Sequence, residues 1–207
     1  MVDIDRLFKE SSRLIAEISA NPEPVVQGMS KWLDYCDSVA PAHKDVWAQV
    51  AKLDFEADQR HLTEWLSQLL ATEPPSHDIN GFWFGLFNPC TADGEVSCQA
   101  YLGGSSEFDP ESESDEWVCQ LSYLPVSRYA NSVVLPEIYR LVGLINDPED
   151  APYLGEAFLC HGYLALVVSN WCHGAMKSQL IGKAAYRAIV MGHDSGDFYR
   201  MTVLGGA

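Results

Sequence analysis

Apolar residues recur at helical spacing through the first third of the chain. They predict a helix near residues 7–18, a second helix over about residues 25–39 and a long third helix over residues 43–70. Proline-containing segments separate these helices, because proline lacks a backbone donor and disfavours helical geometry in the residue before it. This third of the chain is therefore expected to be all helical, with a small helical subdomain over residues 1–78 as an alternative to full integration.

The pattern changes at Gly81, where aromatic and strand-forming residues begin. Residues 82–87 and 96–102 flank an Ala-Asp-Gly turn signal, and this arrangement predicts a β-hairpin. Residues 117–124 are a third strand candidate. The polar segment over residues 103–116 is expected to be a loop between strands.

The last part of the chain combines one very apolar segment with a second hairpin pattern. After a helix around residues 137–145, residues 154–172 are hydrophobic nearly all round, which is typical of a central core helix. Polar residues interrupt this segment, and its longest apolar run is far short of the roughly 20 residues that a membrane span needs. Residues 186–191 and 198–204 flank a polar tip at 193–197 and predict a hairpin.

This order of elements indicates the fold class. Helices come first, and strands with a core helix among them follow, so we expect an α+β fold and not a strictly alternating α/β one. The sheet is expected to be antiparallel, with a buried central helix and a C-terminal hairpin. A chain of 207 residues is long enough to bury its own core, and we expect a single domain over residues 1–207.

The charge balance narrows the choice of partners. The chain has 13 Lys and Arg against 29 Asp and Glu, for a formal net charge of −16. Nucleic acids and anionic membrane surfaces would repel such a chain, because both require clustered basic residues. A basic protein is the electrostatically favoured partner, although a negative net charge also serves plain solubility.

The cysteines and the N-terminal sequence indicate a cytoplasmic location. Six cysteines at irregular spacing in a chain of this size do not form a disulfide framework, and they are most simply buried thiols in a reducing compartment. The first residues lack the basic and apolar regions of a signal peptide.

The predicted loop over residues 103–116 carries the densest charge in the chain. It contains six carboxylates within ten residues: Glu107, Asp109, Glu111, Glu113, Asp115 and Glu116. An EF-hand calcium loop starting at Asp109 would need Gly at its sixth position and Glu at its twelfth, where this chain has Ser114 and Gln120. Two interpretations remain: a solvated loop, or an acidic docking surface for Lys and Arg side chains of a partner.

Two Cys-His dipeptides, Cys160-His161 and Cys172-His173, are the feature of the sequence that most resembles a metal-binding motif. Their spacing argues against a shared ion. On one helix, His161 and Cys172 would lie about 16 Å apart along the axis, whereas zinc ligands lie about 2.0–2.3 Å from the ion. Cys90, Cys98 and Cys119 could approach one another in the sheet, but they lack the CxxC spacing of structural zinc sites. We expect no metal site.

Catalytic and cofactor-binding motifs are also missing from the sequence. His193, Asp194 and Ser195 are the residue types of a hydrolase triad, but three consecutive residues on a turn point outward and cannot align as base, orienting group and nucleophile. Their better interpretation is a turn in which Gly196 supplies a positive φ. No phosphate-binding loop or dinucleotide-binding motif occurs, so no cofactor is expected.

Two segments carry a family resemblance. One contains Gly81-Phe82-Trp83-Phe84-Gly85 followed by Tyr101-Leu102-Gly103-Gly104-Ser105 and Trp117, and the other is the segment from Val190 to Phe198. Together they resemble uncharacterised bacterial proteins of the kind found among polymorphic-toxin immunity proteins. The resemblance covers roughly residues 81–204, and it implies an inhibitor that binds and occludes a basic toxin.

The leading hypothesis is therefore a cytosolic acidic protein-binding module, more plausibly a binder than an enzyme. We expect the partner to contact mainly carboxylates of the loop over residues 103–116, which are Asp109, Glu111, Glu113, Asp115 and Glu116. Asp194 and Asp197 at the hairpin tip are expected to be secondary contacts. The rival hypothesis is a small hydrolase-type enzyme whose site forms from distant carboxylates with His161, His173 or His193, because catalytic groups need not be adjacent in sequence. A structural subunit of a larger assembly is the third, and it would show a large exposed apolar patch.

Overall fold

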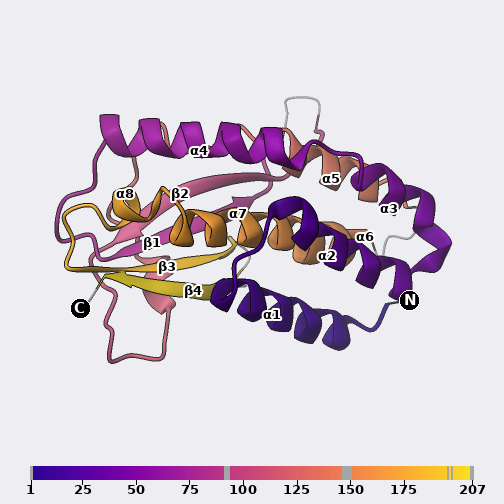
Figure 1. The fold of residues 1–207 in the computed structure, drawn as a ribbon, viewed down its shortest axis with the longest axis horizontal. Coiled ribbons are helices and arrows are strands. Elements are labelled where there is room, and N and C mark those ends of the chain that lie inside the picture. The colour runs from indigo at the N-terminus through magenta and orange to yellow at the C-terminus, as the bar shows by residue number, and fades with distance from the viewer. Residues whose placement is uncertain (1, 91–93, 146–150, 195, 197, 206–207) are drawn as a thin grey trace.

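The computed structural model describes residues 2–90, 94–145, 151–194, 196 and 198–205 (Figure 1). Its first third is helical, as predicted. The helices are α1 (Ile4–Ala20), α2 (Val25–Val39), the short 3-10 helix η1 (Pro41–His43), α3 (Lys44–Val50) and α4 (Phe55–Thr72). The side chain of Asp3 accepts a hydrogen bond from the backbone N–H of Arg6 and so caps the start of α1.

The predicted long helix over residues 43–70 is two helices. α3 ends at Val50 and α4 begins at Phe55. The cause is Asp54, whose carboxylate accepts the backbone N–H of Ala57 at 2.9 Å and so acts as an N-cap, where a continuous helix would have placed it on the solvent face. An N-cap residue adopts a non-helical conformation, and the helix therefore has to restart at this point.

A four-stranded sheet follows, in the order β2-β1-β3-β4. The sheet is mixed, whereas the sequence predicted a purely antiparallel one. The two hairpins are confirmed: β1 (Gly81–Phe87) pairs antiparallel with β2 (Gln99–Ser105), and β3 (Tyr186–His193) pairs antiparallel with β4 (Phe198–Gly205). The two hairpins meet through β1 and β3, which run parallel because a long, mostly helical connection returns the chain to the same end of the sheet.

The third strand predicted over residues 117–124 is wrong. Its first residues form the 3-10 helix η2 (Glu116–Cys119), and only one isolated bridge, between Gly104 and Tyr123, connects the rest of the segment to the edge of β2. The apolar residues that suggested a strand serve another purpose. Trp117 and Val118 are buried against the sheet face instead of pairing with its edge.

The predicted central helix is confirmed, and it consists of three parts: α6 (Ala151–Leu154), the π-helix η3 (Gly155–Cys160) and α7 (His161–His173). α5 (Val134–Val142) precedes it, and α8 (Lys177–Ile181) leads from it into β3. α7 is buried on nearly all sides, in line with its sequence. No helix among the described residues is both long and apolar enough to cross a membrane.

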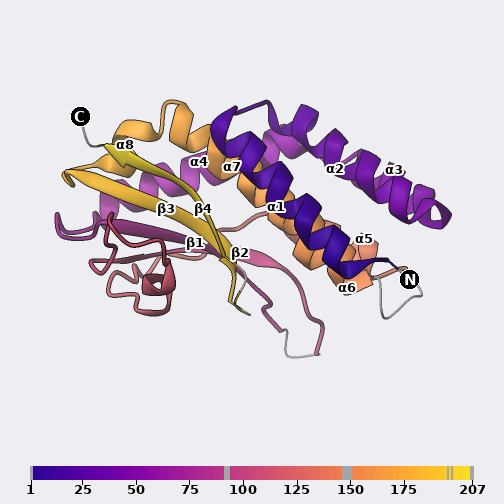
Figure 2. The same cartoon turned by 90° about the horizontal axis from the view of Figure 1, so that it is seen from below.

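The helices and the sheet form two layers. Figure 2 shows the helices on one face of the sheet and an irregular loop on the other face. The main core joins side chains of the N-terminal helices, α7 and one sheet face. A smaller core of Trp83, Phe108, Trp117, Val118, Ala188 and Val190 lies on the other face. This second core positions the candidate site.

Candidate functional site

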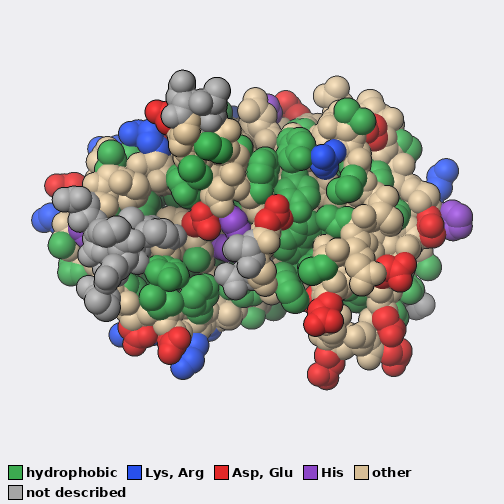
Figure 3. All heavy atoms as spheres, turned by 180° about the vertical axis from the view of Figure 1, so that it is seen from behind, with side chains coloured by type: hydrophobic (Ala, Val, Ile, Leu, Met, Phe, Trp, Pro, Cys, Tyr) green, Lys and Arg blue, Asp and Glu red, His purple; other side chains and the backbone are tan. Residues whose placement is uncertain are grey.

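The acidic residues singled out by the sequence lie on a loop over the outer face of the sheet, opposite the helices. We call residues 106–120 the acidic loop. It projects at the lower left of Figure 1, and the same projection carries a group of acidic side chains in the reverse view of Figure 3. Asp109, Glu111, Glu113 and Glu116 are exposed. The loop therefore combines a charged outer side with the apolar inner side described next.

Two aromatic side chains fasten the acidic loop to the sheet. Phe108 and Trp117 are 3% and 5% exposed, and their rings meet edge to face at 6.1 Å between centroids. Gly81 of β1 makes room for the indole, since a Cβ at that position would lie 2.6 Å from Trp117 Cη2. Burial of two large aromatic residues gives this loop a hydrophobic anchor that a solvated loop lacks.

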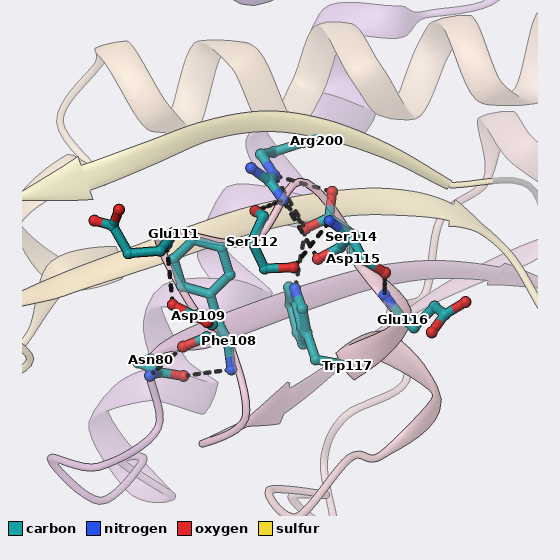
Figure 4. Close-up of polar contacts among 10 residues, drawn as sticks. All are labelled: Asn80, Phe108, Asp109, Glu111, Ser112, Ser114, Asp115, Glu116, Trp117 and Arg200. Carbon is teal, nitrogen blue, oxygen red and sulfur yellow. Dashed lines mark hydrogen bonds and ion pairs between the residues drawn. The ribbon is translucent and has the colours of Figure 1, made fainter.

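Polar contacts complete the anchor (Figure 4). The side chain of Asn80 accepts the backbone N–H of Phe108 at 3.1 Å and donates to the carbonyl of Phe108 at 2.9 Å. Asp115 accepts hydrogen bonds from the Trp117 indole N–H at 3.0 Å and from Arg200 Nε at 2.9 and 3.0 Å. Arg200, which belongs to β4, also donates to the carbonyl of Ser112 at 3.2 Å. Charge-assisted hydrogen bonds of this kind are about twice as strong as neutral ones.

Asp115 therefore differs from the other four acidic residues predicted to contact a partner. It is only 7% exposed, and its carboxylate is engaged with Arg200 and Trp117. Among the described residues, no Lys, Arg or His forms an ion pair with any of the remaining four: Asp109, Glu111, Glu113 and Glu116. The predicted set thus divides into one anchoring carboxylate and four outward-facing ones.

The acidic loop encloses a polar hollow of about 300 Å³. Its wall consists of Glu107, Asp109, Ser112, Ser114, Glu116, Trp117 and Gln120. Short-range hydrogen bonds shape this wall: Asp109 accepts the N–H of Glu111, and Ser114 Oγ accepts the N–H of Glu116. Three carboxylates, those of Glu107, Asp109 and Glu116, thus line a space large enough to receive a basic side chain.

The second predicted set lies at the C-terminal hairpin tip. Asp194 is exposed, and its Oδ1 accepts a hydrogen bond of 2.8 Å from the Tyr101 hydroxyl, which in turn accepts the Trp83 indole N–H at 2.9 Å. Burial, together with the hydrogen bond to Asp194, raises the pKa of Tyr101. Asp197 lies outside the described residues. Asp194 therefore bonds to the sheet and not to the acidic loop.

Two of the three histidines named for the rival enzyme come together. His161 and His193 are 1% and 6% exposed, and their ring centroids lie 6.3 Å apart. Nε2 of His193 lies 3.5 Å from Oε1 of Glu156. His173 is separate from this pair: it is exposed at the end of α7, with its Nδ1 2.9 Å from the carbonyl of Ser169.

Sequence reasoning did not single out Glu156 and Asn88, which join His161 and His193 in this cluster. Glu156 lies on the π-helix. Asn88 follows β1 and donates to Glu156 Oε2 at 2.8 Å. The one available signal was that Glu156 and His161 interrupt an otherwise apolar segment. Their partners come from strands far away in the sequence, so no local pattern could identify them.

The cysteines are arranged differently from a metal site. Cys98 and Cys160 are buried, and the Cys160 thiol donates to the carbonyl of Leu135, whereas Cys90 and Cys119 are exposed. Within the part of the chain that the structure describes, no group of three or more His, Cys, Asp or Glu side chains is placed to hold a metal ion.

Comparison of the chain with protein-family models, with curated proteins and with solved structures finds no match. The resemblance to polymorphic-toxin immunity proteins therefore remains a prediction from the sequence. The functional argument has to come from the geometry of the residues themselves.

Proposed function

We propose that this chain is a binding protein that docks a basic partner protein through its acidic loop, as an immunity-like inhibitor of a basic toxin would do. The observation that supports this proposal is the two-sided construction of the loop. Its inner side is fixed to the sheet by Trp117, Phe108 and the Asp115–Arg200 ion pair, while four carboxylates face outward.

Pre-organisation is the physical reason why this construction favours binding. A free acidic loop would lose conformational entropy on binding, and that loss would offset much of the Coulombic gain. An anchored loop has already been ordered by folding. The formal net charge of −16 adds a long-range field that speeds the approach of a basic partner and is screened by salt.

The test is a binding comparison between two variants of equal charge. The loop variant carries Asp109→Asn, Glu111→Gln, Glu113→Gln and Glu116→Gln and keeps Asp115, so the anchor stays intact. The control variant removes four exposed carboxylates on helices instead: Asp34→Asn, Asp37→Asn, Asp45→Asn and Glu64→Gln. Both variants change the net charge by the same amount and differ only in position.

Wild type and both variants would be used to capture partners from the native cell, with elution by rising salt and identification by mass spectrometry. The affinity of the partner recovered would then be measured. At about 0.2–1 kcal/mol for each exposed ion pair, the loss of four carboxylates should make the loop variant bind about fourfold to several-hundredfold more weakly, with a flatter salt dependence, and the control should bind nearly as wild type. Equal affinity of the two variants would refute the assignment to the acidic loop.

A small enzyme is the second candidate, and one observation favours it. His193 and Glu156 form a histidine–carboxylate pair, an arrangement used in general acid–base catalysis. Conversion of any substrate by the wild type and its loss in His193→Asn, with the acidic-loop variant unaffected, would favour this candidate over the binding protein.

A further inference from the structure

The cluster formed by His161, His193, Glu156 and Asn88 lies at one end of the central parallel strand pair. β1 and β3 are the parallel pair, and their carboxyl ends, Phe87 and His193, lie at the same end of the sheet. From there the chain continues from β1 to β2 on one side and from β3 to β4 on the other. Side chains that follow β1 or end β3 are therefore brought together at this end of the sheet.

Polar side chains from four segments converge at this point. We call Asn88, Glu156, His161, His193 and Tyr199 the strand-end site. Oε1 of Glu156 lies 3.5 Å from His193 Nε2, and its Oε2 accepts the Asn88 amide at 2.8 Å. The backbone carbonyl of Glu156 lies 3.0 Å from His161 Nδ1. Tyr199 packs edge-on against the His161 ring at 5.9 Å between centroids.

A π-helix places Glu156 at the strand-end site. η3 spans Gly155–Cys160, between two α-helical segments, and a π-helical turn widens the backbone by one residue. Such turns are rare in proteins and occur frequently at functional sites. Here the contact between His161 Nδ1 and the carbonyl of Glu156 supports the widened turn, and the carboxylate of Glu156 is directed toward the end of β3.

The hydrogen bonds of Asn88, His161 and Glu156 indicate the chemistry of a matching ligand. The Asn88 amide nitrogen donates to both Ser97 O and Glu156 Oε2, so both of its hydrogens are used. Because a carbonyl can only accept, Nδ1 of His161 is the donor in its contact with Glu156 O. The carboxylate at the site belongs to Glu156, and a carboxylate only accepts hydrogen bonds. A ligand that matches it must donate.

The charge of the strand-end site leads to the same conclusion. Across the described parts of the chain, Glu156 forms no ion pair with a Lys or Arg. The separation of 3.5 Å between Glu156 and His193 is longer than the roughly 2.7–2.9 Å of a tight charge-assisted hydrogen bond. Negative charge therefore remains for a cationic ligand to neutralise.

An aromatic hollow adjoins the strand-end site. It has a volume of about 340 Å³ and is lined by Phe8, Ser12, Gly196, Phe198 and Tyr199. Tyr199 belongs to both, because it lines the hollow and contacts His161. Aromatic rings favour cations over their faces and provide apolar area for an alkyl chain. The volume falls at the lower end of the range for small-molecule sites.

We propose that the strand-end site binds a small organic cation, an alkylammonium or alkylguanidinium group, with Glu156 as its counter-ion and the aromatic hollow as the receptor of its alkyl part. This site is separate from the acidic loop. The proposal depends neither on the docking of a protein partner nor on proton transfer by His193.

The probes are n-butylammonium, n-butylguanidinium and, as a neutral control of similar shape, n-butanol. Each is titrated into the full chain while the side-chain NMR signals of His161, His193 and Tyr199 are followed. The two cations should shift these signals saturably, with Kd on the order of 1 mM, and butanol should not. Glu156→Gln should weaken cation binding about tenfold or more, since it removes a charge-assisted contact. Glu64→Gln, which neutralises an exposed carboxylate on α4, should leave binding unchanged.

The proposal would be overturned by no saturable shift with either cation, by equal binding of butanol, or by unchanged affinity in Glu156→Gln. If Glu156→Gln fails to fold, the comparison of cations with butanol in the wild type still decides. The four-residue acidic-loop variant should retain cation binding in full. Loss of binding in that variant would indicate general attraction of cations to an acidic protein and would contradict the strand-end assignment.

Discussion

The anchor of the acidic loop can be tested with a single conservative substitution, Asp115→Asn. This change keeps the shape of the side chain but removes the charge that Arg200 and the Trp117 indole N–H bind. Hydrogen bonds to charged groups contribute about 1.5–3 kcal/mol each. Because the Arg200 side chain is 30% exposed and water can replace part of the lost contact, we expect a cost of about 2 kcal/mol.

The loss should appear as local opening of the acidic loop and not as global unfolding. The second core is small and separate from the main core, so the loop can detach while the helices and the sheet persist. A cost of about 2 kcal/mol corresponds to opening that is about 30-fold more frequent.

Native-state hydrogen exchange measures this opening directly. The amides of Val118 and Phe108 are the reporters, because they donate to the carbonyl of Asp115 and to the Asn80 side chain when the loop is closed. Both should exchange about 30-fold faster in Asp115→Asn. The amides at the centre of β1 and β3 should keep their rates. Glu113→Gln, an exposed loop carboxylate, is the matched control and should change neither set.

Two outcomes would refute this reasoning. Unchanged exchange at Val118 and Phe108 would mean that the ion pair does not hold the loop. Equal acceleration at the loop and at the sheet centre would mean that the two cores open together. A double-mutant cycle with Arg200→Met then measures the pair itself: the double variant should be less destabilised than the sum of the single variants.

Two further predictions concern the thiols and the pH dependence of stability. A thiol reagent should quickly modify only the exposed Cys90 and Cys119 in the folded protein, and all six cysteines after unfolding. The other four cysteines, Cys36, Cys98, Cys160 and Cys172, are buried, and burial raises the pKa of Cys172 to about 12. Rapid modification of four thiols in the folded protein would contradict the packing. The backbone N–H groups of Ser127 and Val126 hold the pKa of Glu73 below its ordinary value of 4.5, so its pKa in the folded protein lies below that in the unfolded chain. The resulting stabilisation of the fold is present above about pH 4.5 and is lost as the pH falls through the folded pKa. The melting temperature of wild type should therefore exceed that of Glu73→Gln at neutral pH and converge with it toward pH 3, and a constant difference would refute this cause.

The sequence patterns predicted most elements because those elements depend on local interactions. Helical spacing, proline boundaries and turn residues all act within a few residues, which is why the N-terminal helices, both hairpins and the buried α7 were foreseen. The break at Asp54 was missed because aspartate suits both a helix surface and an N-cap. The parallel pairing of β1 with β3 joins segments about a hundred residues apart, and no local pattern reports it.

The candidate site shows the same division between local and distant causes. The concentration of acidic residues on one loop is visible in the sequence, but the role of Asp115 depends on Arg200, which lies 85 positions away. An alternating run of Asp and Glu therefore cannot reveal which member is buried. Likewise, Glu156 and His193 acquire a shared role only when the π-helix is brought to the end of β3.

The way the sheet is covered should allow the proposed binding surface to be perturbed without unfolding the rest of the protein. Phe82, Phe84 and Leu86 of β1 face the main core, while Trp83 faces the second core, so the strand is apolar on both sides and shows no clear alternation. Helices cover one face and the acidic loop covers part of the other. Loss of the loop cover removes a small core without disturbing the larger one. Asp115→Asn, which keeps all four outward carboxylates but loosens their support, therefore distinguishes charge from pre-organisation. If the partner is lost with the support alone, the order imposed on the acidic loop, and not its charge by itself, is what the partner recognises.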